Sequence, residues 1–216
     1  DPEKFDNPEQ KRFFRNIDYE NSKEKIFLFN TDRMDFKTTL VNLNCFVGVA
    51  AGFRPLLILK RCGFYEDTVV KYIDYSSVSL KFRKWIVENW DGRNIEEATN
   101  GFSRFIGREI YWLKSAHDTF DGNYQKMIQE FGGYDSWINF WNEYRKLKHE
   151  YHEIDIVQDT PKIKSLLEPA GLNYLYFSNC FNTEAGLVKW GKTKLKNQLK
   201  FLLTDLKDIP VIVDGS

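Results

Sequence analysis

The sequence predicts an α/β fold in which a mostly parallel sheet lies between two layers of helices. Short runs of apolar and β-branched residues, typical of buried parallel strands, alternate with segments of helical periodicity. The links between these segments are short, as in repeated strand–helix–strand units. A glycine also separates the first of these strands from its helix. These three observations indicate a Rossmann-like three-layer sandwich, and the 216 residues suit a single domain.

The first strand–turn–helix unit surrounds residue 50. Residues 45–51 (CFVGVAA) are small, apolar and β-branched, which predicts a buried strand. Gly52 interrupts this run, and Pro55 stands in the position that the first turn of a helix accepts. Gly63 is suited to end that helix. An earlier strand is expected at residues 25–30, as a candidate for one edge of the sheet, after a polar stretch that forms a short helix or an arm.

The second unit follows directly. Residues 68–75 (TVVKYIDY) predict a parallel strand with Asp74 at its carboxyl end. Ser76 and Ser77 are suited to cap the next helix, which stops near Asp91 and Gly92. Residues 93–148 are mostly helical in character and too long for a plain connection. We expect them to form a helical insertion within the domain, placed as a cap over a functional site.

The alternation of strands and helices then resumes. A strand is expected at residues 151–157, a helix capped by Thr160 at 160–167, a strand at 173–178, an amphipathic helix at 193–206 and a last strand at 209–213. With these elements the single domain extends over residues 1–216.

The charge balance argues against nucleic-acid binding. The chain has 31 basic and 31 acidic residues, whereas nucleic-acid-binding domains normally carry a basic excess. One local basic stripe has helical spacing and predicts a solvated helix face; it comprises Lys192, Lys194, Lys196 and Lys200. The aromatic content of 16% can fill a bulky core or line a pocket for a flat ligand.

The cysteines and histidines predict neither a disulfide framework nor a metal site. Cys45, Cys62 and Cys180 are far apart, odd in number and without a metal-binding spacing to any histidine. A reducing, cytoplasmic location is therefore expected. No apolar run reaches the length of a membrane span. Because the chain begins with Asp1 rather than Met, other domains of a longer polypeptide are among the expected partners.

Gly52 and Asp74 have the spacing of a nucleoside-binding pair. Gly52 ends the first parallel strand, and Asp74 ends the second one 22 residues later, close to the expected separation of about 20 residues. Ligands of open α/β sheets lie outside the carboxyl ends of the strands. A glycine turn allows close approach of the backbone, and a carboxylate on the next strand can accept both ribose hydroxyls. Asp74 is alternatively a helix-capping residue.

The stretch from Gly48 to Ile86 resembles the cofactor-binding half of the class I S-adenosylmethionine-dependent methyltransferases. DIV at residues 155–157 is similar to the third strand of that family, whose end contacts adenine, and YLYFSNCF at 174–181 to its fourth strand and substrate-facing loop. The resemblance implies S-adenosylmethionine as cofactor. The positions that it assigns to cofactor binding are Gly48, Ala50, Gly52, Arg54, Asp74, Asp155 and Ser178.

The turn departs from the family pattern acid-x-Gly-x-Gly-x-Gly. Laid on Gly52, this pattern places Gly48 at the acid, Ala50 at the first glycine and Arg54 at the last. Arg54 could pair with the carboxylate of the cofactor or with another anion such as a phosphate. Alternatively, it merely precedes Pro55 and points to solvent.

Methyl transfer needs little acid–base chemistry, because in-line positioning of the activated methyl group supplies much of the rate. A base is required only where the accepting atom carries a proton. Asn179 could orient an amine or a hydroxyl, next to Ser178, Tyr176 and Phe181 on the expected substrate side. The candidate bases are His117, His149 and His152, and Asn179 and His152 are the candidate catalytic residues.

Three functions are compatible with these residues and motifs. The first is S-adenosylmethionine-dependent methyl transfer to a small molecule or a saccharide. The second is a catalytically inactive methyltransferase-like domain that serves as a structural or interaction module of a larger protein. The third is a nucleotide or nucleotide-sugar enzyme with Arg54 on a phosphate, and it ranks last because no Gly-rich dinucleotide loop is present.

Overall fold

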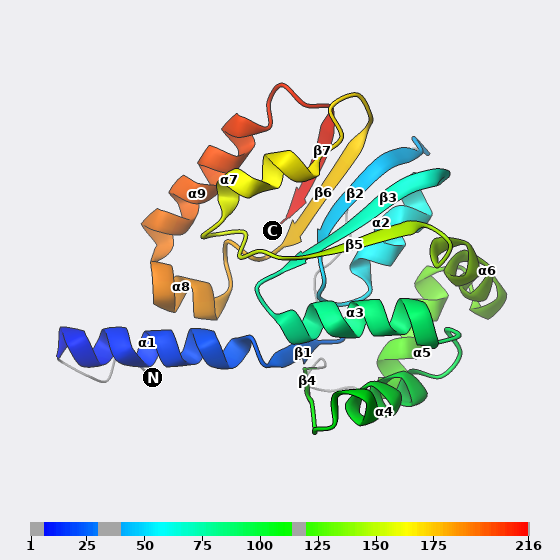
Figure 1. The fold of residues 1–216 in the computed structure, drawn as a ribbon, viewed down its shortest axis with the longest axis horizontal. Coiled ribbons are helices and arrows are strands. Elements are labelled where there is room, and N and C mark those ends of the chain that lie inside the picture. Colours follow the sequence, from blue (N-terminus) through cyan, green and yellow to red (C-terminus); the bar gives the residue numbers. More distant parts are fainter. Residues whose placement is uncertain (1–6, 30–39, 114–119, 216) are drawn as a thin grey trace.

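A computed structural model describes residues 7–29, 40–113 and 120–215 of the chain, and Figure 1 shows their arrangement. At the centre is a sheet of five parallel strands. In spatial order these strands are β5 (Lys148–Glu153), β3 (Phe64–Asp74), β2 (Leu43–Val49), β6 (Asn173–Ser178) and β7 (Val211–Gly215). Counted along the chain, the order is third, second, first, fourth, fifth, which is the Rossmann arrangement. The predicted fold class is confirmed.

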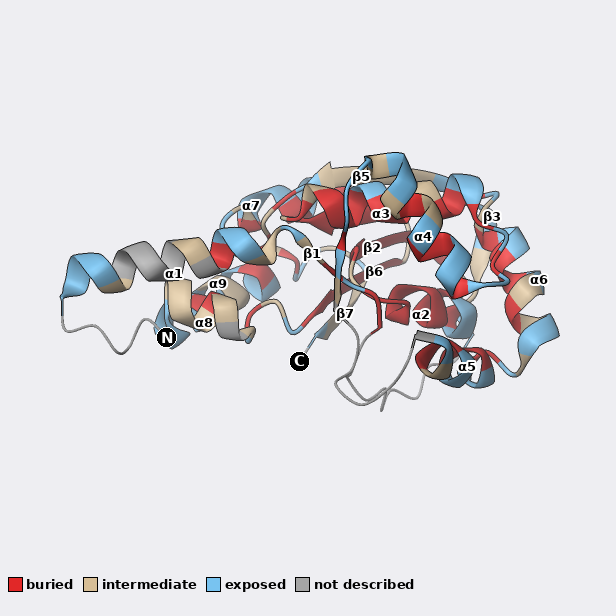
Figure 2. Ribbon diagram, turned by 90° about the horizontal axis from the view of Figure 1, so that it is seen from below, coloured by how far each residue is buried: buried red, intermediate tan, exposed pale blue. Residues whose placement is uncertain are grey.

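Two layers of helices cover the sheet. On one face, the guanidinium of Arg54 lies over the Tyr176 ring and that of Arg83 over the Tyr72 ring. These arginines come from α2 (Arg54–Cys62) and α3 (Ser77–Asn89). On the other face, Lys71 Nζ donates to the Leu166 carbonyl at 2.8 Å, in the 3₁₀ turn Lys164–Leu166. That turn follows α7 (Thr160–Ile163), which packs against α9 (Lys192–Asp205). Figure 2 shows the buried residues in the sheet and on the inner sides of the helices.

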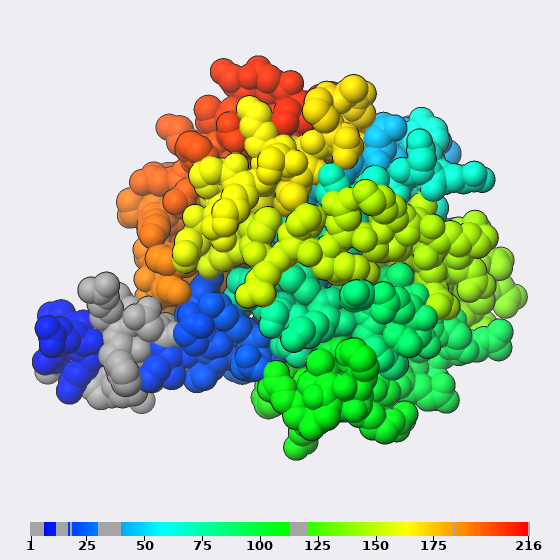
Figure 3. Space-filling view, viewed as in Figure 1, coloured from blue at the N-terminus to red at the C-terminus, as the bar shows by residue number. Residues whose placement is uncertain are grey.

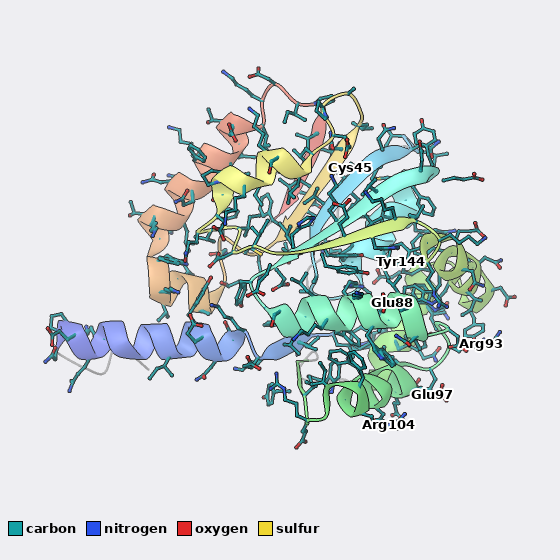
Figure 4. The ribbon with its side chains drawn as sticks, in the orientation of Figure 1. Cys45, Glu88, Arg93, Glu97, Arg104 and Tyr144 are labelled. Carbon is teal, nitrogen blue, oxygen red and sulfur yellow. The ribbon has the colours of Figure 1, made fainter. Side chains whose placement is uncertain are left out.

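In its described residues, the helical insertion forms three helices and one short strand: α4 (Ile95–Ile106), β4 (Tyr111–Leu113), α5 (Phe120–Glu130) and α6 (Tyr134–Tyr144). It joins the core through aromatic rings. Trp137 packs on Trp90 and Trp141, and its Nε1 donates to the Gly92 carbonyl at 2.7 Å. Tyr144, the last residue of α6, packs against the sheet, and its hydroxyl is 2.8 Å from that of Tyr72. Figure 4 labels Tyr144 and also Glu88, Arg93, Glu97 and Arg104, which are exposed.

The N-terminal strand does not extend the main sheet. β1 (Lys25–Phe27) pairs in parallel with β4 as a separate two-stranded sheet. The expectation that residues 25–30 fill an edge of the main sheet is therefore wrong for the described part of that segment. The preceding helix α1 (Pro8–Ser22) packs against α8 (Glu184–Trp190), a helix that the sequence pattern did not predict. In Figure 3 α1 extends beyond the rest of the molecule.

Several expected boundaries shift by a few residues. The strand expected at 151–157 is β5 and ends at Glu153, so Asp155 lies in the following turn. The N-cap expected at Thr160 is at Asp159. The strand expected at 209–213 is β7, which starts two residues later. The lysine stripe of α9 is exposed, as predicted. Among the described helices, none is both long and apolar enough to cross a membrane.

Candidate functional site

The candidate site lies at the carboxyl-end edge of the sheet, where the strand order reverses between β2 and β6. Crevices at such reversal points are the usual ligand sites of open α/β sheets. Four predicted positions lie at this edge: Gly52 follows β2, Asp74 ends β3, Asp155 follows β5 and Ser178 ends β6. The fold therefore gathers residues that are up to 126 positions apart in the chain.

The turn after β2 is held by backbone hydrogen bonds within the chain. The Ala50 amide donates to the Ile73 carbonyl at 3.2 Å, and the Gly52 amide to the Phe27 carbonyl at 2.7 Å. Gly52 has φ of 67°, a left-handed conformation that glycine adopts without steric cost. The glycine at position 52 is thus required by the turn geometry. The amides of Ala50 and Gly52 are already bonded to the protein.

Arg83 holds the same turn from within the core, and it is a residue that the sequence motifs did not single out. Its Nη2 donates to the Ala50 carbonyl at 2.8 Å and also to the Gly52 carbonyl. The side chain is 2% exposed, and its guanidinium carbon lies 4.8 Å from the Tyr72 ring centroid and 5.7 Å from that of Phe53. The sequence does contain a signal for the burial of Arg83, because this residue stands three positions from both Leu80 and Ile86, on the apolar face of its helix.

Asp74 is buried behind this turn. Its Oδ1 accepts the Ser76 amide at 2.9 Å, so the helix-capping interaction is present. Burial raises the pKa of Asp74 to about 7, although the Ser76 and Ala50 amides and the Arg83 charge each favour the carboxylate. A carboxyl group with this pKa exists in both protonation states near neutral pH. Hydroxyl donors of a ligand would favour its ionised form.

Two of the positions assigned to cofactor binding lie against aromatic rings. Gly48 lies inside β2 rather than in the turn, beside Tyr72 and Tyr176. A Cβ at Gly48 would stand 2.5 Å from the Phe46 ring, so the aromatic ring occupies the space that glycine leaves. Arg54 is 9% exposed, with its guanidinium carbon 5.9 Å from the Tyr176 ring centroid. The alternative in which Arg54 points to solvent is therefore wrong.

Asp155 binds the N-terminal helix. Its Oδ1 accepts the Val157 amide at 3.0 Å and the Gln158 amide at 3.2 Å, and its Oδ2 accepts the Tyr19 hydroxyl. Tyr19 is 4% exposed and stacks on Tyr75, with ring centroids 5.2 Å apart. No spacing within residues 1–25 predicts these contacts, because Tyr75 and Asp155 lie far from Tyr19 in the sequence, just after β3 and β5.

The substrate side of the edge is formed by the end of β6. Ser178 is buried and has φ of 52°, which is uncommon for a residue other than glycine and is found at functional sites. Asn179 follows it and is exposed. Tyr176 and Phe181 are both buried, and Phe181 packs edge-on against Phe177. Among these four positions, only the Asn179 side chain is freely accessible to a substrate from solvent.

The candidate histidine bases are dispersed. His117 lies outside the described residues. His149 is half-buried and packs edge-on against Tyr144, and its burial lowers its pKa to about 4. His152 pairs with Ile73, whereas Glu153 pairs with Asp74, so His152 lies on the opposite face of the sheet from Asp74. Its Nε2 is 3.4 Å from Glu150 Oε2. The fold therefore does not place His152 beside Asp74.

No metal-binding cluster of His, Cys, Asp or Glu occurs in the described parts of the chain. Cys45 and Cys62 are buried thiols. Comparison of the chain with family models, with curated proteins and with solved structures gives no match.

Proposed function

We propose that this chain binds S-adenosylmethionine at the carboxyl-end edge of its sheet and transfers the methyl group to a small molecule or a saccharide. The observation that carries this proposal is that Gly52, Asp74, Asp155 and Ser178 all lie along the carboxyl-end edge of the sheet that contains the reversal of strand order. In this proposal the ribose hydroxyls donate to Asp74, and the nucleobase lies toward Asp155. The resemblance in sequence supplies the identity of the cofactor, and the edge geometry is compatible with it.

The chemistry asked of the protein is mainly positioning. The sulfonium methyl group is already activated, so transfer depends on in-line placement of the acceptor. Asn179, exposed next to Ser178, is the side chain proposed to orient an accepting amine or hydroxyl. No base is assigned, since His149 is half-buried against Tyr144 and His152 lies on the other face. The buried thiols of Cys45 and Cys62 fit a reducing, cytoplasmic location.

Isothermal titration calorimetry with S-adenosylmethionine and S-adenosylhomocysteine tests this proposal. The expected result is micromolar binding by the unmodified chain and its loss in Asp74→Ala. Asp67→Ala is the matched control, because Asp67 is an exposed aspartate on the same strand and should leave binding unchanged. Absence of binding at millimolar ligand would overturn the proposal.

The affinity should also depend on pH, because ribose hydroxyls bind the carboxylate form of Asp74. With a pKa of about 7 in the free protein, the dissociation constant should fall about tenfold between pH 6 and pH 8. Titrations in buffers of different ionisation enthalpy should reveal release of a proton on binding. A pH-independent affinity without proton release would exclude Asp74 as the ribose ligand.

A second candidate is a catalytically inactive domain that serves as an interaction module. The specific observation in its favour is that polar groups of the turn are bonded within the chain. The Ala50 and Gly52 amides have protein acceptors, and their carbonyls accept from Arg83. Under this hypothesis, the intact chain binds no cofactor, and its partners are other domains of a longer polypeptide.

A further inference from the structure

The C-terminal turn of α1 places an aromatic ring at the carboxyl-end edge of the sheet. Tyr19 stacks on Tyr75 with an interplanar angle of 19°, and its hydroxyl donates to Asp155 Oδ2. The ammonium of Lys189, from α8, lies 3.7 Å from the Tyr19 ring centroid. The Trp190 ring packs edge-on against the Tyr19 ring, with centroids 6.0 Å apart. Tyr19 is thus enclosed by elements of the fold that lie far from it in sequence.

These contacts have the chemistry of a binding site for a planar ring. An aromatic platform, a cation over a ring face and a carboxylate that accepts from the ring edge are recurring means of holding a nucleobase or a similar ring. The carboxylate selects a ring with a donor at its edge. The phenol hydroxyl of Tyr19 provides such a donor, and so does an exocyclic amine.

This enclosure adjoins the proposed ribose ligand. Tyr75, which supplies the platform, immediately follows Asp74 at the end of β3. The Asp155 charge is close enough to Asp74 to contribute to its raised pKa. A nucleoside whose ribose reached Asp74 could therefore place its base against Tyr75 and Asp155.

We propose that Tyr75, Asp155 and Lys189 form a subsite for an amine-bearing nucleobase, and that Tyr19 of α1 occupies this subsite in the structure. This inference rests on the proposed function, because it extends the same edge of the sheet. Base and tyrosine compete for one place, so the base binds only when the end of α1 withdraws. A hydrogen bond from Ser76 Oγ to the Lys23 carbonyl at 2.6 Å and one between Ser22 Oγ and the Tyr75 hydroxyl at 3.0 Å hold that end in place.

The competition predicts a measurable cost in affinity. A ligand that binds only the open form has an apparent affinity reduced by the fraction of open molecules, so a form open for about 10% of the time costs about tenfold. Removal of the Tyr19 ring should therefore restore the affinity that this competition costs.

The test measures adenosine binding by calorimetry in the unmodified chain, Tyr19→Ala, Tyr19→Phe and the control Asn21→Ala, an exposed residue of the same helix. Tyr19→Ala should bind adenosine about tenfold more tightly than the unmodified chain or Asn21→Ala. Tyr19→Phe, which lacks only the donor to Asp155, should lie between them. A further Asp155→Ala change should reverse the gain. Equal or weaker adenosine binding by a folded Tyr19→Ala would overturn the inference.

Hydrogen exchange of the unmodified chain provides a test that needs no variant. Saturating adenosine should accelerate exchange of the amides of residues 17–22, because the ligand displaces them. Unchanged or slower exchange with bound adenosine would overturn the inference, as would absence of adenosine binding by both the unmodified chain and Tyr19→Ala.

The outcomes separate this inference from the proposed function. S-adenosylmethionine binding that depends on Asp74, without tighter adenosine binding by Tyr19→Ala, would sustain the function and remove the subsite. Tighter adenosine binding by Tyr19→Ala, without any S-adenosylmethionine binding, would sustain the subsite and remove the methyl transfer.

Discussion

Two buried charged residues, Asp74 and Arg83, determine the properties of the turn after β2. Asp74 is 9% exposed and Arg83 is 2% exposed, and the Arg83 charge favours the ionised form of Asp74. Burial nevertheless dominates and raises the pKa of Asp74. Among the described residues, Nε and Nη1 of Arg83 have no hydrogen-bond partner, so its charge is stabilised mainly by two carbonyls and two aromatic rings.

Asp74 should reduce stability as pH rises. Its pKa is about 7 in the folded chain and near 3.8 when unfolded, so the folded state holds the extra proton between about pH 4 and pH 7. The free energy of unfolding therefore falls through this window, by up to roughly 4 kcal/mol. Asp74→Asn keeps the acceptor for the Ser76 amide but carries no charge. At pH 8 it should be more stable than the unmodified chain in urea denaturation.

His149 changes the free energy of unfolding with pH in the direction opposite to Asp74. Its folded pKa of about 4 lies below the usual value of 6.5, so its contribution to stability is present above about pH 6.5 and is lost as pH falls toward 4. The Asp74 effect is therefore measured as the difference between the unmodified chain and Asp74→Asn at each pH. If this difference stayed constant from pH 4 to pH 8, Asp74 would not titrate near 7.

The charge of Arg83 should lower the pKa of Asp74. In Arg83→Met the favourable charge is lost, so the pKa of Asp74 should rise further above its value of about 7. Arg83→Lys retains the charge and should shift it less. Carbon-13 NMR titration of the Asp74 carboxyl group measures the change. Lys84→Met, an exposed neighbour on the same helix, is the control. An identical Asp74 pKa in Arg83→Met and Lys84→Met would contradict the coupling.

At the scale of elements, the insertion of residues 93–148 is part of the hydrophobic core. α6 contributes Trp137 and Trp141, both completely buried, and the Trp137 ring packs edge-on against Phe53, next to the candidate turn. The insertion therefore supports the turn from the side of α2 and α3. The rings of this cluster stack and cross at centroid distances typical of aromatic pairs, which stabilise packing beyond the area they bury.

Truncation of the cluster should destabilise the whole domain. Trp137→Ala removes a completely buried ring and its hydrogen bond to the Gly92 carbonyl, at a cost of about 4 kcal/mol. Tyr134→Ala, at an exposed position on the same helix, should change the free energy of unfolding by less than about 0.5 kcal/mol. Chemical denaturation compares the two variants. Equal, small effects would show that the insertion unfolds independently of the sheet.

At the scale of the whole molecule, the parallel sheet requires that its central strands be covered on both faces. Cys45 on β2 and Cys62 at the end of α2 are completely buried, and burial raises the pKa of each thiol to about 11. Because both thiols are completely buried, we expect them to report on unfolding of the molecule as a unit.

Thiol reactivity should follow this burial. Cys180 is only partly buried and should react first with a disulfide reagent at pH 8. Cys45 and Cys62 should react only at the rate of global unfolding, and all three should react rapidly in denaturant. Reaction of Cys62 in the native protein as fast as Cys180 would contradict the packing of α2 against the sheet. The same result for Cys45, whose Sγ donates to the Leu166 carbonyl, would contradict the packing on the opposite face.

Local patterns predicted most of the sheet. The runs at 45–51, 68–75 and 173–178 correspond to central strands, because strands buried on both faces are continuously apolar. The placement of Gly52 and Asp74 at the same edge was also predictable from the sequence, because their spacing is that of one strand–helix–strand unit. The short strand β1 was assigned to the wrong sheet, because pairing between β1 and β4 joins segments more than 80 residues apart.

The sequence by itself determined the fold class, the order of the main elements and the edge where the candidate residues gather. These depend on periodicity and on short links, which are local properties of the chain. Only the tertiary structure decided which groups form hydrogen bonds with the polar groups of that edge. Arg83 donates to the turn carbonyls, the Phe27 carbonyl accepts from the Gly52 amide, and the Tyr19 hydroxyl donates to Asp155. Such contacts depend on close packing between distant segments, so no local pattern encodes them.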